Sequence, residues 1–341
     1  MIILLQLQLL RVKEPSHTSK GYLCFMITLG VWIGCGVIFT IEYRFIDFSD
    51  FLPSWLLRAK INQNSQGSIV YKILIILLVL MISVNARPLT KISDISYGKD
   101  KLQKLDVYYK NSVQNAPIII MVHGGAWSMG DKYRFKTVAN KVSRWVPKGF
   151  IVVSVNYRLL PKADPQIQAD DVVSAMVYVQ KHAKIWGGNA KKVILMGHSS
   201  GGHLVSLIAT TANRYKRLKP WLGTISLDSA ALNIVNLMQK RHNSFYDDAF
   251  GKNEKYWEKV SPSHHLHAKI KPMLLVCSIE RANNPCQAAE NFSKKAKALG
   301  VRTEITPQHL NHFKINKELG KENAYTLQVE AFIRSLGVEL K

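Results

Sequence analysis

Residues 193–207 read VILMGHSSGGHLVSL, and this stretch decides the fold. A continuous apolar run, typical of a buried parallel strand, ends at Gly197, and an apolar run with helical spacing follows Gly202. Between them, residues 197–201 match G-x-S-x-G with Ser199 at the centre. Ser199 is therefore a candidate nucleophile, although a glycine- and serine-rich turn joining strand to helix explains the short motif equally well.

The glycines of this motif have a physical reason. A serine on a sharp turn from strand to helix has a strained backbone, and the residues two before and two after it press together. Only small residues fit there. The helix that follows points its N-terminus at the serine, so the backbone N–H of Ser200 is a candidate donor to an oxyanion.

A second glycine motif strengthens this interpretation. Residues 123–127 read HGGAW and follow the apolar strand APIIIMV. We expect the backbone N–H groups of Gly125 and Ala126 to face a substrate oxygen, with Gly124 shaping the turn and also part of the oxyanion hole. His123 is expected to brace the loop. A phosphate-binding turn is the alternative, but no G-x-G-x-x-G or Walker pattern follows.

A nucleophilic serine needs a base and an acid. His312, in QHLNHF, follows the last predicted strand and is the candidate base, with His309 the lesser choice. Glu280 follows the strand MLLVCS and is the preferred acid on position in the chain alone. Asp228, at the end of GTISLD, is the alternative acid. Asp170 and Asp171 are expected to cap a helix or to supply charges to its first turn.

Apolar strands alternate with amphipathic helices over residues 87–341, which predicts an α/β domain with helices on both faces of a mostly parallel sheet. The predicted strands lie at 104–110, 116–125, 150–159, 191–197, 223–229, 271–278 and 302–308, and the predicted helices at 131–149, 165–183, 202–212, 285–300 and 323–337. Residues 230–270 are irregular and rich in aromatic residues, and we expect them above the carboxyl ends of the strands, where ligands bind in such folds.

Residues 1–86 form a separate hydrophobic region. Residues 22–41 contain no Lys, Arg, Asp or Glu, and an uncharged apolar stretch of twenty residues can span a bilayer. Residues 70–86 resemble a secretory signal with cleavage after Ala86, which predicts a secreted or periplasmic domain. A signal normally stands at the start of a chain, so this interpretation expects the natural start near Val70, with the residues before it not part of the natural protein. The alternative is a domain anchored to a membrane by N-terminal helices.

The charged residues, histidines and cysteines indicate which partners and cross-links the chain can have. Of the net charge of +23, +20 belongs to residues 87–341, where Lys and Arg are scattered from Lys91 to Lys341. This pattern indicates a generally basic surface and no specific nucleic-acid site. The three histidines of SHHLH lack the spacing of a helical zinc site, so we expect an ordinary basic loop. Cys277 and Cys286 could form a disulfide outside the cytoplasm or remain two packed thiols.

The motifs HGGAW, GHSSGG and NHF, in this order and spacing, resemble the α/β-hydrolase esterases, nearest the carboxylesterase and arylformamidase-like branch. The resemblance covers about residues 95–338. It implies an α/β-hydrolase fold with a mostly parallel eight-stranded sheet, a serine nucleophile, no metal or organic cofactor, and a small-molecule ester or formyl-amide substrate. A serine esterase is the first expectation. An arylformamidase acting on N-formyl aromatic amides and a non-catalytic, membrane-associated binding protein on a hydrolase scaffold remain alternatives.

Overall fold

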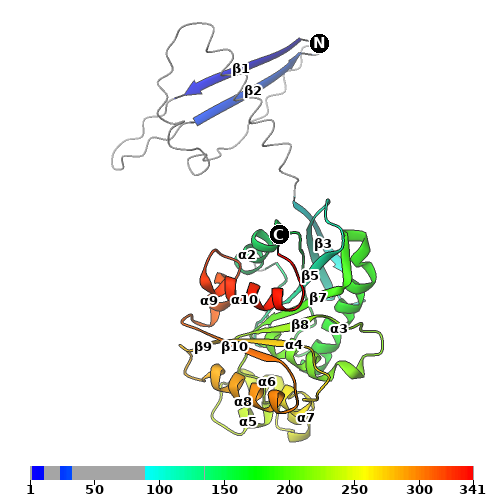
Figure 1. Cartoon of the computed structure of the whole chain (residues 1–341), viewed down its shortest axis with the longest axis vertical. Helices are drawn as coiled ribbons and strands as arrows, with labels where there is room; N and C mark the ends of the chain where they lie inside the picture. Colours follow the sequence, from blue (N-terminus) through cyan, green and yellow to red (C-terminus); the bar gives the residue numbers. More distant parts are fainter. Residues whose placement is uncertain (1, 11–23, 33–88, 134, 341) are drawn as a thin grey trace, which may run out of the picture. The chain divides into compact units, whose positions relative to one another are not determined.

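The computed structural model describes residues 2–10, 24–32, 89–133 and 135–340. It contains two compact units, Met1–Ser83 and Val84–Lys341. In the first unit, strand β1 (Ile2–Leu10) pairs antiparallel with strand β2 (Cys24–Trp32). The second unit is an α/β domain built on one eight-stranded sheet (Figure 1).

The eight strands lie in the order β10-β9-β8-β7-β5-β6-β4-β3. The six strands from β10 to β6 are parallel, whereas β4 and β3 add to the edge in antiparallel fashion. The strands are β3 (Leu89–Ser96), β4 (Lys104–Lys110), β5 (Ala116–Val122), β6 (Ile151–Val155), β7 (Gly188–His198), β8 (Gly223–Leu227), β9 (Met273–Ser278) and β10 (Thr303–Gln308).

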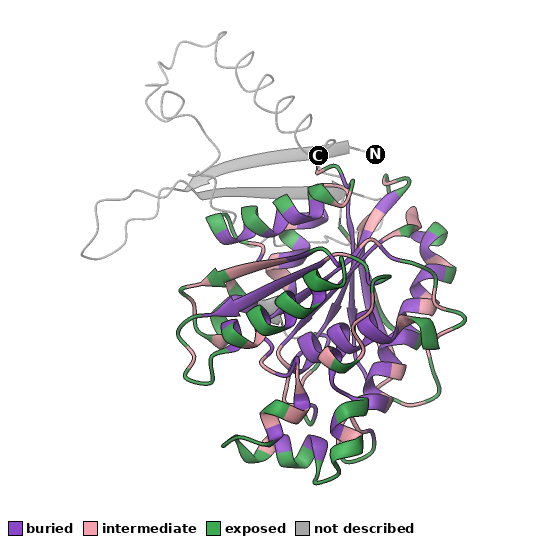
Figure 2. Ribbon diagram, turned by 60° about the horizontal axis from the view of Figure 1, so that its bottom comes forward, coloured by how far each residue is buried: buried purple, intermediate pink, exposed green. Residues whose placement is uncertain are grey.

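Helices cover both faces of this sheet, and each face has its own apolar core. One face carries α3 (Pro165–His182), α4 (Ser200–Thr211) and α8 (Pro285–Ala298); the other carries α2 (Phe135–Trp145), α9 (His312–Glu318) and α10 (Ala324–Ser335). Figure 2 shows the strands buried between helices whose outer sides are exposed. The predicted architecture, a mostly parallel eight-stranded sheet with helices on both faces, is confirmed.

The side chains of β5 explain the two cores. Ile118, Ile120 and Val122 belong to the core under α3 and α4, whereas Ile119 and Met121 belong to the core under α2 and α10. Successive side chains of a strand point to opposite faces, so a strand covered on both sides needs an unbroken apolar run. All five of these side chains are buried.

Three short α-helices and a 3-10 turn (Pro262–His264) lie between β8 and β9, in the segment predicted to be irregular: the α-helices are α5 (Ile234–Met238), α6 (Ser244–Phe250) and α7 (Glu254–Lys259). We call residues 230–270 the cap. The edge strand β3 and helix α9 were also absent from the predicted elements. The expectation for Asp170 and Asp171 is wrong, because Asp164 caps α3 while the Asp171 carboxylate pairs with Arg158.

The N-terminal predictions are tested only in part. Residues 24–32 form a strand, so the expected membrane-spanning helix over 22–41 is wrong for the described part of that stretch. An apolar run of this length fits a strand as well as a helix, and here it pairs with the apolar run 2–10. No helix among the described residues is long and apolar enough to cross a bilayer. The signal-like segment 70–86 lies outside the described residues.

Candidate active site

Ser199 lies on the sharp turn between β7 and α4, as the motif predicts. Its backbone has φ 58° and ψ −120°, a conformation that costs a non-glycine residue on the order of 1–3 kcal/mol. A Cβ atom on Gly201 would lie 2.5 Å from the carbonyl oxygen of His123, and one on Gly197 would collide with the carbonyl oxygen of Gly201. The crossing of the chain around the serine therefore requires glycine on both sides.

His312 is the histidine whose ring reaches this serine. Its Nε2 lies 2.9 Å from Ser199 Oγ. His312 is the first residue of α9, and Asn311 caps that helix by accepting a hydrogen bond from the N–H of Lys314. The side chain of His198 donates from Nε2 to the carbonyl oxygen of His312 (2.9 Å). Burial lowers the pKa of His198 to about 3, so this imidazole is neutral and serves as a fixed support.

Asp228, at the carboxyl end of β8, holds the other side of the imidazole. Its Oδ2 lies 2.6 Å from Nδ1 of His312, and its Oδ1 accepts a hydrogen bond from the N–H of Ser278 at 2.8 Å. Burial raises the pKa of this carboxyl group, but the hydrogen bond with His312 and the charge of Arg281 outweigh that effect and lower it. The group is therefore a buried carboxylate that can orient the imidazole and stabilise its protonated form.

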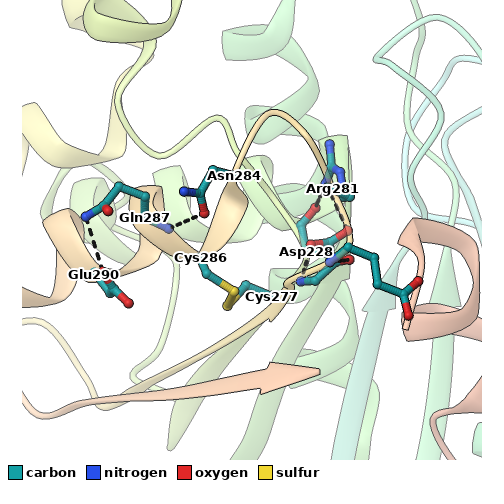
Figure 3. Close-up of a disulfide and its surroundings, with 9 residues drawn as sticks. Asp228, Cys277, Arg281, Asn284, Cys286, Gln287 and Glu290 are labelled. Carbon is teal, nitrogen blue, oxygen red and sulfur yellow. Dashed lines mark hydrogen bonds and ion pairs between the residues drawn. A yellow bond between two sulfur atoms is a disulfide. The ribbon is translucent and has the colours of Figure 1, made fainter. Parts of the chain in front are cut away.

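Glu280 does not hold the histidine, so the preference for Glu280 as the acid is wrong. Its side chain is exposed, and Asp228 occupies Nδ1 of His312 instead. The loop after β9 contributes Arg281 in its place, whose Nη1 lies 2.9 Å from Asp228 Oδ2 (Figure 3). The alternative acid, Asp228, is the residue that the structure brings to Ser199 and His312.

The HGGAW loop lies directly against the nucleophile. A Cβ atom on Gly124 would lie 2.8 Å from Cβ of Ser199. The next three residues have positive φ angles: Gly125 144°, Ala126 49° and Trp127 59°. Among the residues that the structure describes, no protein acceptor takes the N–H of Gly125 or Ala126. Within this part of the chain both N–H groups are therefore left without a protein acceptor, and Ser200 is buried at the first position of α4. Their role as oxyanion donors stays a prediction.

Buried aromatic contacts fix this loop from behind. The ring of His123 stacks on Tyr157 with centroids 4.4 Å apart, and the Tyr157 hydroxyl donates to the carbonyl oxygen of His123 at 2.9 Å. This placement agrees with the expected bracing role. Gly130 completes the turn with φ 118°, and a Cβ atom there would collide with the His123 ring.

His203 connects the loop to the cap, and sequence reasoning missed it. Its Nδ1 accepts a hydrogen bond from the indole N–H of Trp127 (3.2 Å), and its Nε2 donates to the carbonyl oxygen of Val260 (2.8 Å). Burial lowers the pKa of His203 to about 4, so the ring is neutral and can both accept and donate. The one sequence signal was its place in GHSSGGH, four residues after the nucleophile, where a helix returns to the same face.

The remaining candidate histidines lie apart from this arrangement. His309 is exposed, and His265 donates from Nε2 to the carbonyl oxygen of Lys259. Within the described residues, no three His, Cys, Asp or Glu side chains gather as metal ligands. Cys277 and Cys286, left open by the sequence, form a disulfide.

The arrangement can perform acyl transfer. It combines a serine hydroxyl, an imidazole within hydrogen-bond reach, a carboxylate that orients the imidazole, and free backbone donors beside the serine. The same arrangement of groups also recurs on unrelated folds, so this chemistry is inferred from the residues of the site and not from the fold.

Comparison with known proteins agrees with this reading. The sequence model of the BD-FAE family matches residues 105–295, more than half of the chain. A protein described as kynurenine formamidase from Danio rerio is 27% identical over 248 residues, which cover 70% of this chain and 80% of that protein. Esterase LipQ from Mycobacterium tuberculosis is 25% identical over 62% of this chain and 54% of its own length.

Solved esterases share the fold. Esterase B from Lactobacillus rhamnosis superposes with a TM-score of 0.61 at 22% identity, over 79% of this chain and 95% of that one. A truncated carbohydrate esterase from gut microbiota gives a TM-score of 0.62 at 16% identity, over 75% of this chain and 99% of that one. These likenesses concern the fold alone, and they confirm the predicted α/β-hydrolase fold.

Proposed function

Because this chain belongs to the BD-FAE family, we propose that it is a serine hydrolase that cleaves carboxylic esters through an acyl-enzyme intermediate. One observation supports this most strongly: the continuous contact from Ser199 Oγ through the His312 ring to Asp228 Oδ2, with distances of 2.9 Å and 2.6 Å. The relatives that are described as esterases point to the same chemistry.

The proposed first step is acylation of the serine. His312 accepts the Ser199 proton at Nε2 while Oγ attacks the ester carbonyl carbon. The oxyanion that forms accepts hydrogen bonds from the N–H groups of Gly125, Ala126 and Ser200. His312 then gives its proton to the leaving alcohol. Asp228 holds Nδ1–H throughout, so Nε2 faces the serine in the form that can accept a proton.

The second step frees the enzyme. A water molecule gives a proton to His312 Nε2 and attacks the acyl carbon, and the same backbone donors stabilise the second oxyanion. Collapse of this intermediate returns the proton to Ser199 Oγ and releases the carboxylic acid. Loss of one oxyanion donor is expected to lower the rate on the order of a hundredfold to a thousandfold.

Cleavage of N-formyl aromatic amides is the second candidate. The kynurenine formamidase from Danio rerio is matched over 80% of its length, whereas the matched part of LipQ is 54%. The same residues would serve, with an amine as the leaving group. The third alternative, a non-catalytic scaffold, is supported by an uncertain acid and by the basic surface, and the Asp228–His312 contact weakens the first of these two reasons.

The test is turnover by the purified full chain. We would measure hydrolysis of p-nitrophenyl esters of increasing acyl length beside N-formylkynurenine, and compare Ser199→Ala with Ser174→Ala, an exposed serine on α3. Ester turnover that falls on the order of a thousandfold or more only in Ser199→Ala supports a serine esterase. Preference for the formyl amide moves the assignment to a formamidase. Absence of Ser199-dependent turnover on both substrates rejects the proposal.

A further inference from the structure

The guanidinium of Arg281 lies beside Asp228 and His312, although the steps proposed above use no cation there. Its Nη1 is 2.9 Å from Asp228 Oδ2 and 2.9 Å from the backbone carbonyl oxygen of Asp228. Asp228 has a left-handed backbone with φ 55°, which turns its carbonyl and its carboxylate so that one nitrogen meets both. Arg281 therefore fixes both the main chain and the side chain of the acid.

The contact between Arg281 and His312 is not a hydrogen bond. Nη1 of Arg281 lies 3.1 Å from Nδ1 of His312, but a guanidinium can only donate, and Nδ1 carries the proton that it gives to Asp228. Both nitrogens instead converge on the same oxygen, Oδ2. That oxygen cannot rotate away from the histidine without breaking its hydrogen bond with Arg281, so the guanidinium locks the acid in the orientation that faces His312.

A disulfide closes the loop that presents Arg281. Cys277, near the end of β9, is bonded to Cys286 in the first turn of α8, nine residues later (Figure 3). Inside the loop, Ser278 donates its N–H to Asp228 Oδ1, and Asn284 caps α8 by accepting from the N–H of Gln287. The short closed loop thus supplies two donors to one carboxylate, from Ser278 and Arg281.

We propose that Arg281 is a positioning residue of the triad and that the Cys277–Cys286 disulfide holds the loop from which it acts. This rests on the proposed function, since Asp228 is the group that Arg281 positions. Arg281 acts through Asp228 and need not touch the substrate. Its loss should lower the rate of the chemical steps and leave substrate binding unchanged, which is a decrease in kcat at constant KM.

The first test replaces Arg281 in the full chain. We expect Arg281→Gln to lower kcat about tenfold, the effect of one lost charge-assisted hydrogen bond, with KM within about twofold. Arg281→Lys, which keeps a cationic donor, should recover most of the rate. The matched control is Arg302→Gln, which removes an exposed arginine paired with Glu304. Equal kcat in Arg281→Gln and the wild type would overturn the proposal.

A second readout does not depend on turnover. The short Nδ1–H···Oδ2 hydrogen bond should give a far-downfield proton resonance, assigned by its disappearance in His312→Gln. Arg281→Gln should broaden or shift this resonance, and Arg302→Gln should not. An unchanged resonance in Arg281→Gln rejects the positioning role. If the wild type shows no Ser199-dependent turnover, the proposed function has failed, and this resonance alone decides the role of Arg281.

The role of the disulfide is tested by a double-mutant cycle. Cys277→Ala with Cys286→Ala should lower kcat in the wild-type background and add little in the Arg281→Gln background, because both changes release the same carboxylate. A decrease of the same size in both backgrounds would show that the disulfide affects catalysis without Arg281, and would reject this half of the proposal.

Discussion

Replacement of Asp228 by Asn distinguishes the acid that the structure places on His312 from the acid that chain order favours. Both carboxylate oxygens of Asp228 only accept: Oδ1 from the N–H of Ser278, and Oδ2 from His312 and Arg281. An asparagine must put an NH₂ group at one of these two places, where it meets a donor. In either orientation the buried network therefore contains two donors that face each other.

The catalytic effect follows from the tautomer of the histidine. If the amide NH₂ faces Nδ1, this nitrogen must accept, and the ring proton moves to Nε2, 2.9 Å from Ser199 Oγ. His312 then has no lone pair with which to take the serine proton. A comparable replacement in a serine protease lowers kcat about 10⁴-fold, which corresponds to about 5 kcal/mol in the activation barrier. We expect a decrease of this order in Asp228→Asn.

The assay is steady-state hydrolysis of the best p-nitrophenyl ester, with Glu280→Gln as the matched control. Glu280 is exposed, so this control should retain kcat within about twofold. Equal thermal transitions of the two variants and the wild type would show that the folds are intact. Asp228→Asn that keeps a tenth of the wild-type rate, or Glu280→Gln that loses a hundredfold, would refute the assignment of the acid.

Two further predictions concern the framework of the site. Gly201→Ala should lower the free energy of unfolding by about 1–3 kcal/mol, because the new methyl group would lie 2.5 Å from the carbonyl oxygen of His123. In denaturant titration, Ser174→Ala, at an exposed position of α3, should lose less. The pKa of His203 is about 4 in the folded state, below its ordinary value, so the unfolded state binds the proton first as the pH falls. The stability contributed by the neutral ring is therefore present above about pH 6.5 and decreases between pH 6.5 and pH 4, by about 2 kcal/mol at pH 5. His203→Gln, which can still accept from Trp127 and donate to Val260, should reduce this difference between denaturant midpoints at pH 7 and pH 5; an unchanged difference would contradict the assignment.

The parallel core and the nucleophile motif could be read from the sequence because each depends on local pattern. Unbroken apolar runs predict strands covered on both faces, and the glycines around Ser199 predict a tight crossing. The edge strand β3 escaped prediction because its side chains are exposed or half-buried, so it has no apolar run. The cap helices have only five to seven residues, too short to form without the packing of aromatic side chains such as Phe250 and Trp257.

The identity of the acid could not be read from the sequence for a geometric reason. Asp228 and Glu280 follow the ends of two neighbouring parallel strands, β8 and β9, and such strands are about 4.8 Å apart. One histidine is therefore within reach of both positions. The choice depends on the backbone of Asp228, with φ 55°, and on the closed loop that turns Arg281 toward the carboxylate and leaves Glu280 exposed.

The link from Trp127 through His203 to Val260 requires a backbone position in the cap but specific side chains next to the nucleophile. The acceptor in the cap is a backbone carbonyl, so any side chain at position 260 that keeps the main chain in place preserves the link. The specific demands fall on Trp127 and His203, which lie on the loop and helix beside the nucleophile. Cap side chains can therefore be replaced without moving the loop beside the serine, as long as the carbonyl group of residue 260 keeps its position.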